Sequence, residues 1–276
     1  MSGAGTTASR IAARYRSGAH DGPEPASSPV IDLALQHRSV REFLPTPVAD
    51  GELESIVAAA QSASQSSNLQ VWSIVAVRDR DRLQRLSATI GGRPYVANAP
   101  LFLAFVADFH RAAALARAHG AEVGTTGCIE NTLVAFADAG IAAQNALLAA
   151  ESLGLGGVFV GSLRNDIPGV VAELGLPRYV FPIFGLSIGR PDPAENAGVK
   201  PRLPMAAVLH HEQYDPEAWR APVAEYEERL ADYFAEHGKD DYSWTRTIVT
   251  RIGSVAGLHG REVMRERLRE QGLDSD

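Results

Sequence analysis

Two groups of basic side chains in this sequence could bind an anion. The first is the segment 37–41 (HRSVR), which places two guanidiniums, an imidazole and a hydroxyl where a helix runs into a turn. The second is the pair Lys200 and Arg202, which flank Pro201. Such groups can surround a phosphate with charge-assisted hydrogen bonds, each contributing about 1.5–3 kcal/mol. Taken alone, the first group fits a phosphate site and a solvated basic turn equally well, and the second is more typical of a surface.

A third candidate site is a patch rich in hydroxyls and amides. It runs over residues 62–68 (SASQSSN), with Gln70 and Trp72 just beyond it. Small polar groups in a turn can hydrogen-bond the edge of a planar heterocycle, although an ordinary loop often has the same composition. Gly161 and Ser162, which follow a predicted strand, are a further candidate ligand contact.

The glycines of segment 154–161 do not form a dinucleotide-binding motif. That motif needs a strand, then glycines, then a helix, whereas here a helix precedes the glycines and a strand follows them. We therefore interpret Gly154, Gly156 and Gly157 as a helix stop and a tight entry into a buried strand.

Other familiar chemistries find no support in the sequence. It contains no P-loop, kinase or paired-carboxylate motif. The run 210–212 (HHE) lacks the spacing of a zinc site, so we expect no metal. The lone Cys128 excludes an intrachain disulfide, and we expect it to be a small buried side chain.

Composition and charge narrow the function further. The 276 residues are 45% hydrophobic and 21% charged, which is ordinary for a globular enzyme. The net charge of −7 argues against nucleic acid as a partner. The longest apolar stretch, 131–155, contains Asp138 and Glu151, so we predict no membrane span and a cytoplasmic protein.

The elements that must position these residues follow from hydrophobic periodicity. We predict a helix that Asp50 caps, with Leu53, Ile56, Val57 and Ala60 on its buried face. The other predicted helices are 30–37, 79–90, 110–119, 131–153, 166–174, 217–236 and 248–271. The predicted strands are 73–77, 101–107, 158–160 and 180–188, the last broken by Pro182.

The order of these elements predicts an α+β fold with a helix-rich core, because the pattern is not one of regular βαβ units. The helix 131–153 is apolar around most of its circumference, which indicates burial at the centre of the molecule or in a subunit interface. Residues 1–20 contain three arginines and no acid, which fits either an organellar transit peptide or a short surface helix around 8–15 on a loose leader.

Together these segments resemble the FMN-dependent nitroreductase family, in particular its oxygen-insensitive NADPH nitroreductases and NADPH–flavin oxidoreductases. The resemblance covers about residues 30–214, with a weaker continuation to the end. It is carried by HRSVR (37–41), SQSSNLQVW (64–72), AQNALLAAESLGLGGVFVGSLRN (143–165), FPIFGLSIGRP (181–191) and KPRLP (200–204).

The resemblance implies a nitroreductase-like α+β fold, in which helices surround a central mixed or antiparallel sheet, and an intertwined homodimer. A nitroreductase domain would occupy 29–276, with a helical extension over 215–276, after a flexible leader of residues 1–28. The implied cofactor is FMN, bound at the dimer interface, and the implied donor is NADPH or NADH.

By the same resemblance, the FMN phosphate and ribityl chain would contact His37, Arg38, Ser39, Lys200 and Arg202. Arg41 would approach the pyrimidine edge of the ring. The partner subunit would line the flavin with Gln65, Ser66, Ser67, Asn68 and Gln70, and the backbone of Phe159, Val160, Gly161 and Ser162 would pass near the ring.

Three positions depart from the family pattern. Arg93 stands where this branch has an amide, and its cation would either lie near the flavin or point away from it. Gln65 replaces a small serine, so we expect backbone contact there. Lys239 would contact the 2′-phosphate of NADPH, but the neighbouring Asp240 and Asp241 keep NADH open as the electron donor.

The function that the resemblance implies is ping-pong reduction of nitroaromatics, quinones or free flavin by NAD(P)H through FMN, with a small molecule as electron acceptor. An alternative is a non-catalytic protein of the same fold that binds or stores flavin. An enzyme of this fold that fragments or dehalogenates its substrate is a third possibility.

Overall fold

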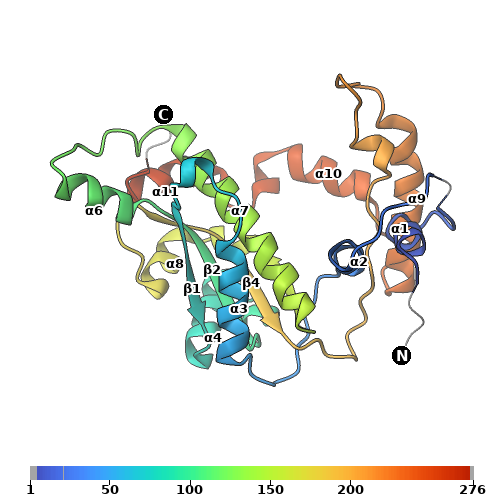
Figure 1. The fold of residues 1–276 in the computed structure, drawn as a ribbon, viewed down its shortest axis with the longest axis horizontal. Helices are drawn as coiled ribbons and strands as arrows, with labels where there is room; N and C mark the ends of the chain where they lie inside the picture. Colours follow the sequence, from blue (N-terminus) through green and yellow to red (C-terminus); the bar gives the residue numbers. More distant parts are fainter. Residues whose placement is uncertain (1–4, 21, 274–276) are drawn as a thin grey trace. The chain divides into compact units, whose positions relative to one another are not determined.

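The structure of this protein is a computed structural model that describes residues 5–20 and 22–273. The chain forms two compact units (Figure 1). Of the described residues, 39–195 and 259–273 form the larger unit, and 5–20, 22–38 and 196–258 form the smaller unit. Each unit is described by itself below.

The larger unit is built on a four-stranded antiparallel sheet in the order β1-β2-β4-β3. This confirms the antiparallel form of the predicted sheet. The strands are β1 (Trp72–Val77), β2 (Leu101–Asp108), β3 (Gly156–Val160) and β4 (Val180–Gly189). A single parallel bridge joins Ser39 to Gly157 and brings the start of this unit against β3.

Helices bury both faces of the sheet, which explains why the sequence of β2 is almost entirely apolar rather than alternating. Leu101, Leu103 and Phe105 of β2 point into one hydrophobic cluster, and Phe102 and Ala104 point into another. The first cluster is covered mainly by α3 (Asp50–Gln61) and α7 (Ile129–Ser152), which run side by side (Figure 1). The second is covered by α4 (Arg80–Thr89), α5 (Pro94–Ala97) and α8 (Ile167–Leu174).

The helix α7 is the predicted long apolar helix, and it lies in the core of this unit. Small side chains, among them Ala135, Ala139 and Ala143, are fully buried and let the helix pack closely. By length and composition α7 could cross a membrane, yet its Asp138 is only 3% exposed within the protein core. The opposite face of α7 exposes Leu133 and Ile141.

Three local expectations in the larger unit are wrong. Pro182 does not break β4, because a bulge at this point shifts the register with β2 and β3 pairs only with residues 185–189. Helix α3 begins after Ala49, whose backbone N–H donates to Glu52 Oε2 at 2.8 Å, so Asp50 is the first helical residue rather than the cap. Cys128 is exposed, because it precedes α7 at the surface.

The smaller unit contains α1 (Thr7–Tyr15), α2 (Pro29–Gln36), α9 (Arg220–Glu236) and α10 (Trp244–Ile252). Helix α1 confirms the expected short helix, but it does not lie loosely at the surface, because Ala12 and Arg14 are buried and Thr7 and Arg10 contact Asp32 of α2. Tyr226, Leu230 and Tyr233 of α9 form the core of this unit. No helix or strand interrupts the proline-rich arm between Gly189 and Met205, as its prolines predict.

The prediction of one helix over 248–271 is wrong. Helix α10 ends at Ile252, and His259 and Gly260 then adopt left-handed φ angles of 54° and 82° that no helix allows. The last helix, α11 (Met264–Glu270), belongs to the larger unit and places Leu268 in its core. One further helix of that unit, α6 (His110–Ala118), agrees with its prediction.

Candidate functional site

Four of the predicted phosphate-binding residues lie in the smaller unit. His37 and Arg38 follow the end of α2, and Lys200 and Arg202 lie on the proline-rich arm. Hydrogen bonds to Arg14 of α1 connect these two segments, which are far apart in the sequence. Sequence reasoning missed Arg14, because nothing in the spacing of the leader indicates that its side chain is buried.

The arm is fastened to α9 by polar and aromatic contacts. The Tyr233 hydroxyl donates to Gly198 O at 3.1 Å, and the Lys200 ammonium lies 5.0 Å from the centre of the Phe234 ring. Burial raises the pKa of Tyr226, and the positive charge of nearby Arg202 opposes that shift. The Lys239 ammonium lies 5.6 Å from the same Phe234 ring, so two of the predicted anion-binding cations surround one aromatic side chain.

The other predicted site residues lie in the larger unit. Val40 N donates to Gly157 O at 3.0 Å, which joins the 39–41 segment to β3. The backbone N–H of Arg41 donates to Glu195 Oε1 at 2.9 Å, and its side chain is exposed. A Cβ on Gly156 would approach Val40 Cγ2 to 2.5 Å, so this close approach requires glycine.

These contacts confirm our interpretation of the glycine cluster. Gly154 follows α7 with a φ of +75°, the left-handed conformation of a helix stop. Gly157 lies in β3, where a Cβ would approach Ser187 O to 2.8 Å. Both positions are therefore explained by backbone geometry.

The polar loop 65–70 has an unusual backbone. Ser67, Asn68 and Gln70 have φ angles of 49°, 53° and 52°, a region that residues other than glycine seldom adopt. The buried carboxylate of Asp138 on α7 accepts hydrogen bonds from Ser66 N at 3.1 and 3.2 Å. Strained loops of this kind are common at ligand sites, where the surrounding structure holds them in place.

Asp138 is a second residue that the sequence analysis did not assign to the site. There it was counted as a polar interruption of an apolar helix. A single acidic residue on an otherwise apolar helix could have indicated this role, because a buried carboxylate needs a hydrogen-bond partner.

Replacing Asp138 with alanine is expected to release the 65–70 loop from α7. The Ser66 N–H would lose its acceptor, which costs about 1–3 kcal/mol of stability. Thermal unfolding checks this, with Asp138→Asn as the control that keeps one acceptor oxygen and should lose much less. Equal melting temperatures for the alanine variant and the wild type would contradict the role assigned to this carboxylate.

Three predicted site residues carry buried polar atoms that lack a hydrogen-bond partner within the part of the chain that the structure describes. They are Gln65 Oε1, Arg93 Nε and Ser162 Oγ. Buried polar atoms are normally satisfied, so these fit a site completed by a polar ligand. Phe159 is 39% exposed and makes an edge-on contact with Phe184, which adds an apolar surface on β3. Buried polar atoms without a partner and an exposed aromatic side chain are the kinds of group that bind a flavin ring, which has polar edges and apolar faces.

A cavity of about 570 Å³ lies between α3 and β1. Of the predicted site residues it contains only Gln70, whose carbonyl oxygen accepts from Arg111 Nη2 at 2.6 Å. Its other walls include Leu53, Val57 and Trp72. Over residues 5–20 and 22–273, no cluster of three His, Cys, Asp or Glu side chains could hold a metal ion.

Comparisons with known proteins identify the family. The chain matches the model of the nitroreductase family over residues 34–190 and that of its C-terminal domain over residues 200–276. It is 38% identical over 242 residues to an FMN reductase [NAD(P)H] of Bacillus subtilis, covering 86% of this chain and 96% of that protein.

An oxygen-insensitive NADPH nitroreductase of Salmonella typhimurium is 44% identical over 213 residues, covering 77% of this chain and 85% of that protein. The solved structure of Bacillus megaterium NfrA2 matches with a TM-score of 0.85 and 35% identity, over 91% of this chain and all of that one. The NADPH:FMN oxidoreductase of Vibrio harveyi, solved with NAD+, matches with a TM-score of 0.80 and 35% identity, over 90% and 99% of the two chains. The chain therefore belongs to the nitroreductase family.

Proposed function

We propose that this protein is an FMN-dependent NAD(P)H oxidoreductase. It would reduce nitroaromatics, quinones or free flavin by two electrons in a ping-pong sequence, as the resemblance implies. The observation that carries the proposal is its similarity, over almost the full length of each relative, to enzymes named for FMN and NAD(P)H. The cationic segments and the buried polar atoms of the candidate site support it.

The residues proposed to hold FMN fall into two sets. His37, Arg38, Ser39, Lys200 and Arg202 would bind the phosphate and ribityl chain, since a dianionic phosphate needs several cations. The ring would be bound by Arg41, Arg93 and residues 159–162 of one subunit, and by residues 65–68 and Gln70 contributed by the other subunit. When bound, FMN supplies the redox chemistry, because it accepts a hydride from NAD(P)H and delivers two electrons to an acceptor.

The side chains of this protein would contribute binding and electrostatics rather than proton transfer. Arg41 and Arg93 would place positive charge at the ring, which favours the uptake of electrons there. The backbone of 159–162 would fix the position of the ring. We therefore propose no catalytic acid or base from the chain.

We also propose that the protein acts as a homodimer in the cytoplasm. Ile129, Leu133 and Ile141 of α7 are 45%, 58% and 48% exposed, and large exposed apolar side chains on one helix are typical of an interface. The domain of residues 29–276 would form this dimer, and residues 1–28 precede it. Sedimentation of the purified protein at twice the monomer mass would support the dimer, and sedimentation at 29.5 kDa would contradict it.

Initial-rate kinetics test the proposed function. With FMN present, NADPH oxidation should accelerate on addition of a quinone or a nitroaromatic. Double-reciprocal plots at several acceptor concentrations should be parallel, because the donor leaves before the acceptor binds. Absence of any acceptor-dependent oxidation of NADPH or NADH would favour the flavin-storage alternative.

Replacing Lys239 with glutamate tests the proposed contact with the 2′-phosphate of NADPH. The change reverses a charge, so KM for NADPH should rise about tenfold or more while KM for NADH stays within about twofold. The matched control is Asp240→Lys, which adds a cation next to this position and should lower KM for NADPH. An equal effect of Lys239→Glu on both nucleotides would contradict the assignment.

A further inference from the structure

One buried arginine in the leader helix α1 binds both segments that carry the proposed phosphate-binding cations of the smaller unit. Arg14 lies in the last turn of α1 and is 7% exposed. Its Nη2 donates to the carbonyl oxygens of Leu35 and His37 at 2.7 and 2.6 Å, and its Nη1 donates to Lys200 O at 3.0 Å. Its own carbonyl oxygen accepts from Arg202 N at 3.1 Å.

The contacts with Leu35 and His37 fix the end of α2. The last carbonyl groups of a helix have no partner within the helix, and they carry the negative end of its dipole. A guanidinium at this place satisfies two such oxygens and is electrostatically favourable. The backbone from which His37 and Arg38 project is therefore held by Arg14.

The contact with Lys200 joins a segment that is 186 residues away in the sequence. Together with the bond from Arg202 N, it holds the backbone on both sides of Pro201. Because the guanidinium is a rigid planar fork, its two terminal nitrogens set the separation between the arm and the end of α2.

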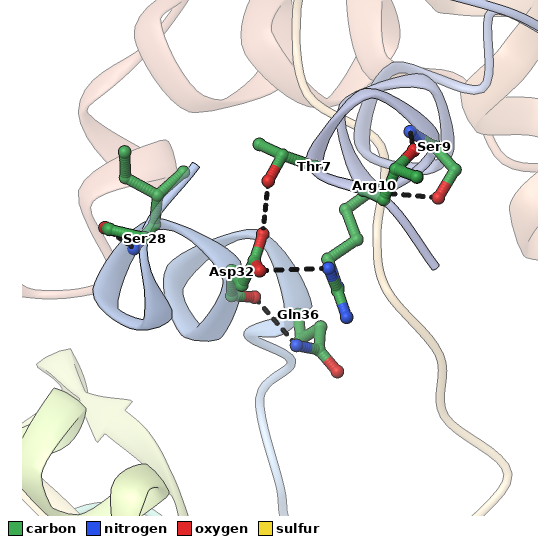
Figure 2. Close-up of polar contacts among 8 residues, drawn as sticks. Thr7, Ser9, Arg10, Ser28, Asp32 and Gln36 are labelled. Atoms are coloured by element: carbon green, nitrogen blue, oxygen red, sulfur yellow. Dashed lines mark hydrogen bonds and ion pairs between the residues drawn. The ribbon is translucent and has the colours of Figure 1, made fainter. Parts of the chain in front are cut away.

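Helix α1 is itself anchored at both ends, so Arg14 is not carried on a loose segment. Asp32 of α2 accepts from Thr7 Oγ1 at 2.7 Å and pairs with Arg10 at 3.1 Å (Figure 2). At the other end of α1, Arg16 pairs with Glu236 of α9 at 2.6 Å. Arg229, also of α9, donates to the carbonyl oxygen of Tyr15 at 3.3 Å.

We infer that Arg14 is a positioning residue for binding of the FMN phosphate, an inference that rests on the proposed function. Its terminal nitrogens donate to backbone oxygens of both segments, so it acts through His37, Arg38, Lys200 and Arg202. By holding the two segments before the ligand arrives, it lowers the ordering cost of binding. The leader is thereby assigned a role in the cofactor site.

The experiment compares two flavins that differ only in the phosphate. Dissociation constants for FMN and riboflavin are measured by flavin-fluorescence quenching on apoprotein prepared from the wild type, Arg14→Ala, Arg14→Lys and Arg10→Gln. The quantity of interest is the ratio of the riboflavin constant to the FMN constant. Arg10→Gln is the matched control, because it removes a cation and an α1–α2 contact but leaves the bonds of Arg14 in place.

For Arg14→Ala we expect this ratio to fall about tenfold, because FMN loses phosphate contacts that riboflavin does not make, whereas both flavins share any loss of contacts to the ribityl chain. Arg14→Lys keeps the positive charge but lacks the planar guanidinium, so its ratio of the two dissociation constants should lie between those of the alanine variant and the wild type. The ratio for Arg10→Gln should stay within about twofold of the wild-type ratio, because a partly exposed ion pair contributes little. If Arg14→Ala does not fold, the lysine variant is measured in the same way.

An unchanged ratio in the Arg14 variants would overturn the inference. Equal losses of FMN and riboflavin affinity would also overturn it, because they indicate general structural damage. A wild-type protein that binds neither flavin would instead contradict the proposed function. The two failures are therefore distinguishable.

Discussion

Replacing Lys200 and Arg202 together with alanine is expected to weaken FMN binding by at least about a hundredfold. Each cation can make a charge-assisted hydrogen bond to a phosphate, worth about 1.5–3 kcal/mol, and a tenfold change in Kd corresponds to about 1.4 kcal/mol. Flavin-fluorescence quenching measures the loss directly. Tyr233 and Arg14 hold the backbone of the arm, so the loss would come from the two side chains rather than from a displaced arm.

The control for this double variant removes the same charge elsewhere in the smaller unit. Arg220 and Arg246 are exposed and pair with Glu217 and Asp241. Replacing both with alanine should leave Kd for FMN within about threefold, because exposed ion pairs contribute little. Retention of FMN by the Lys200 and Arg202 variant at unchanged affinity would contradict the placement of the phosphate.

The second large effect is expected in the core of the larger unit. Gly185 of β4 faces the ring of Phe102, and a Cβ there would overlap the ring atoms. Phe102 is fully buried in the second hydrophobic cluster, so the ring has little room to move. Gly185→Ala should therefore lower the free energy of unfolding by about 3 kcal/mol, as measured by urea denaturation.

Two further variants make this stability prediction specific. Gly51→Ala changes an exposed glycine of α3 whose Cβ would meet no atom within 4 Å, so it should be neutral or slightly stabilising. Phe102→Leu should relieve part of the loss in Gly185→Ala, giving a coupling energy of about 1 kcal/mol or more in a double-mutant cycle. Additive effects would show that the ring is not what Gly185 accommodates.

Local patterns predicted most of the elements that position the site. The long helix 131–153 is observed as α7 within two residues at each end, because a long run of mostly apolar residues and the following Gly154 define it. Strand β2 was recognisable from its length and its continuous apolar residues. The break at His259 and Gly260 within the predicted helix 248–271 was not predicted, because a charged amphipathic pattern continues across it.

The residues missed in the site share a physical cause. Arg14 and Asp138 act on backbone groups that are distant in the sequence, Lys200 O and Ser66 N. A hydrogen bond to a backbone atom leaves no trace in the identity of the partner residue. The left-handed conformation of Ser67, Asn68 and Gln70 likewise depends on tertiary contacts rather than on residue type.

The most direct test of the proposed function is an anaerobic titration of the purified protein loaded with FMN. The flavin absorbance is followed during addition of NADPH and, in a separate sample, NADH, and then after addition of a quinone. The account predicts bleaching by one equivalent of at least one nucleotide, and full recovery of the flavin band after one equivalent of quinone. A flavin band that persists with both nucleotides, or a protein that does not bind FMN, would contradict it.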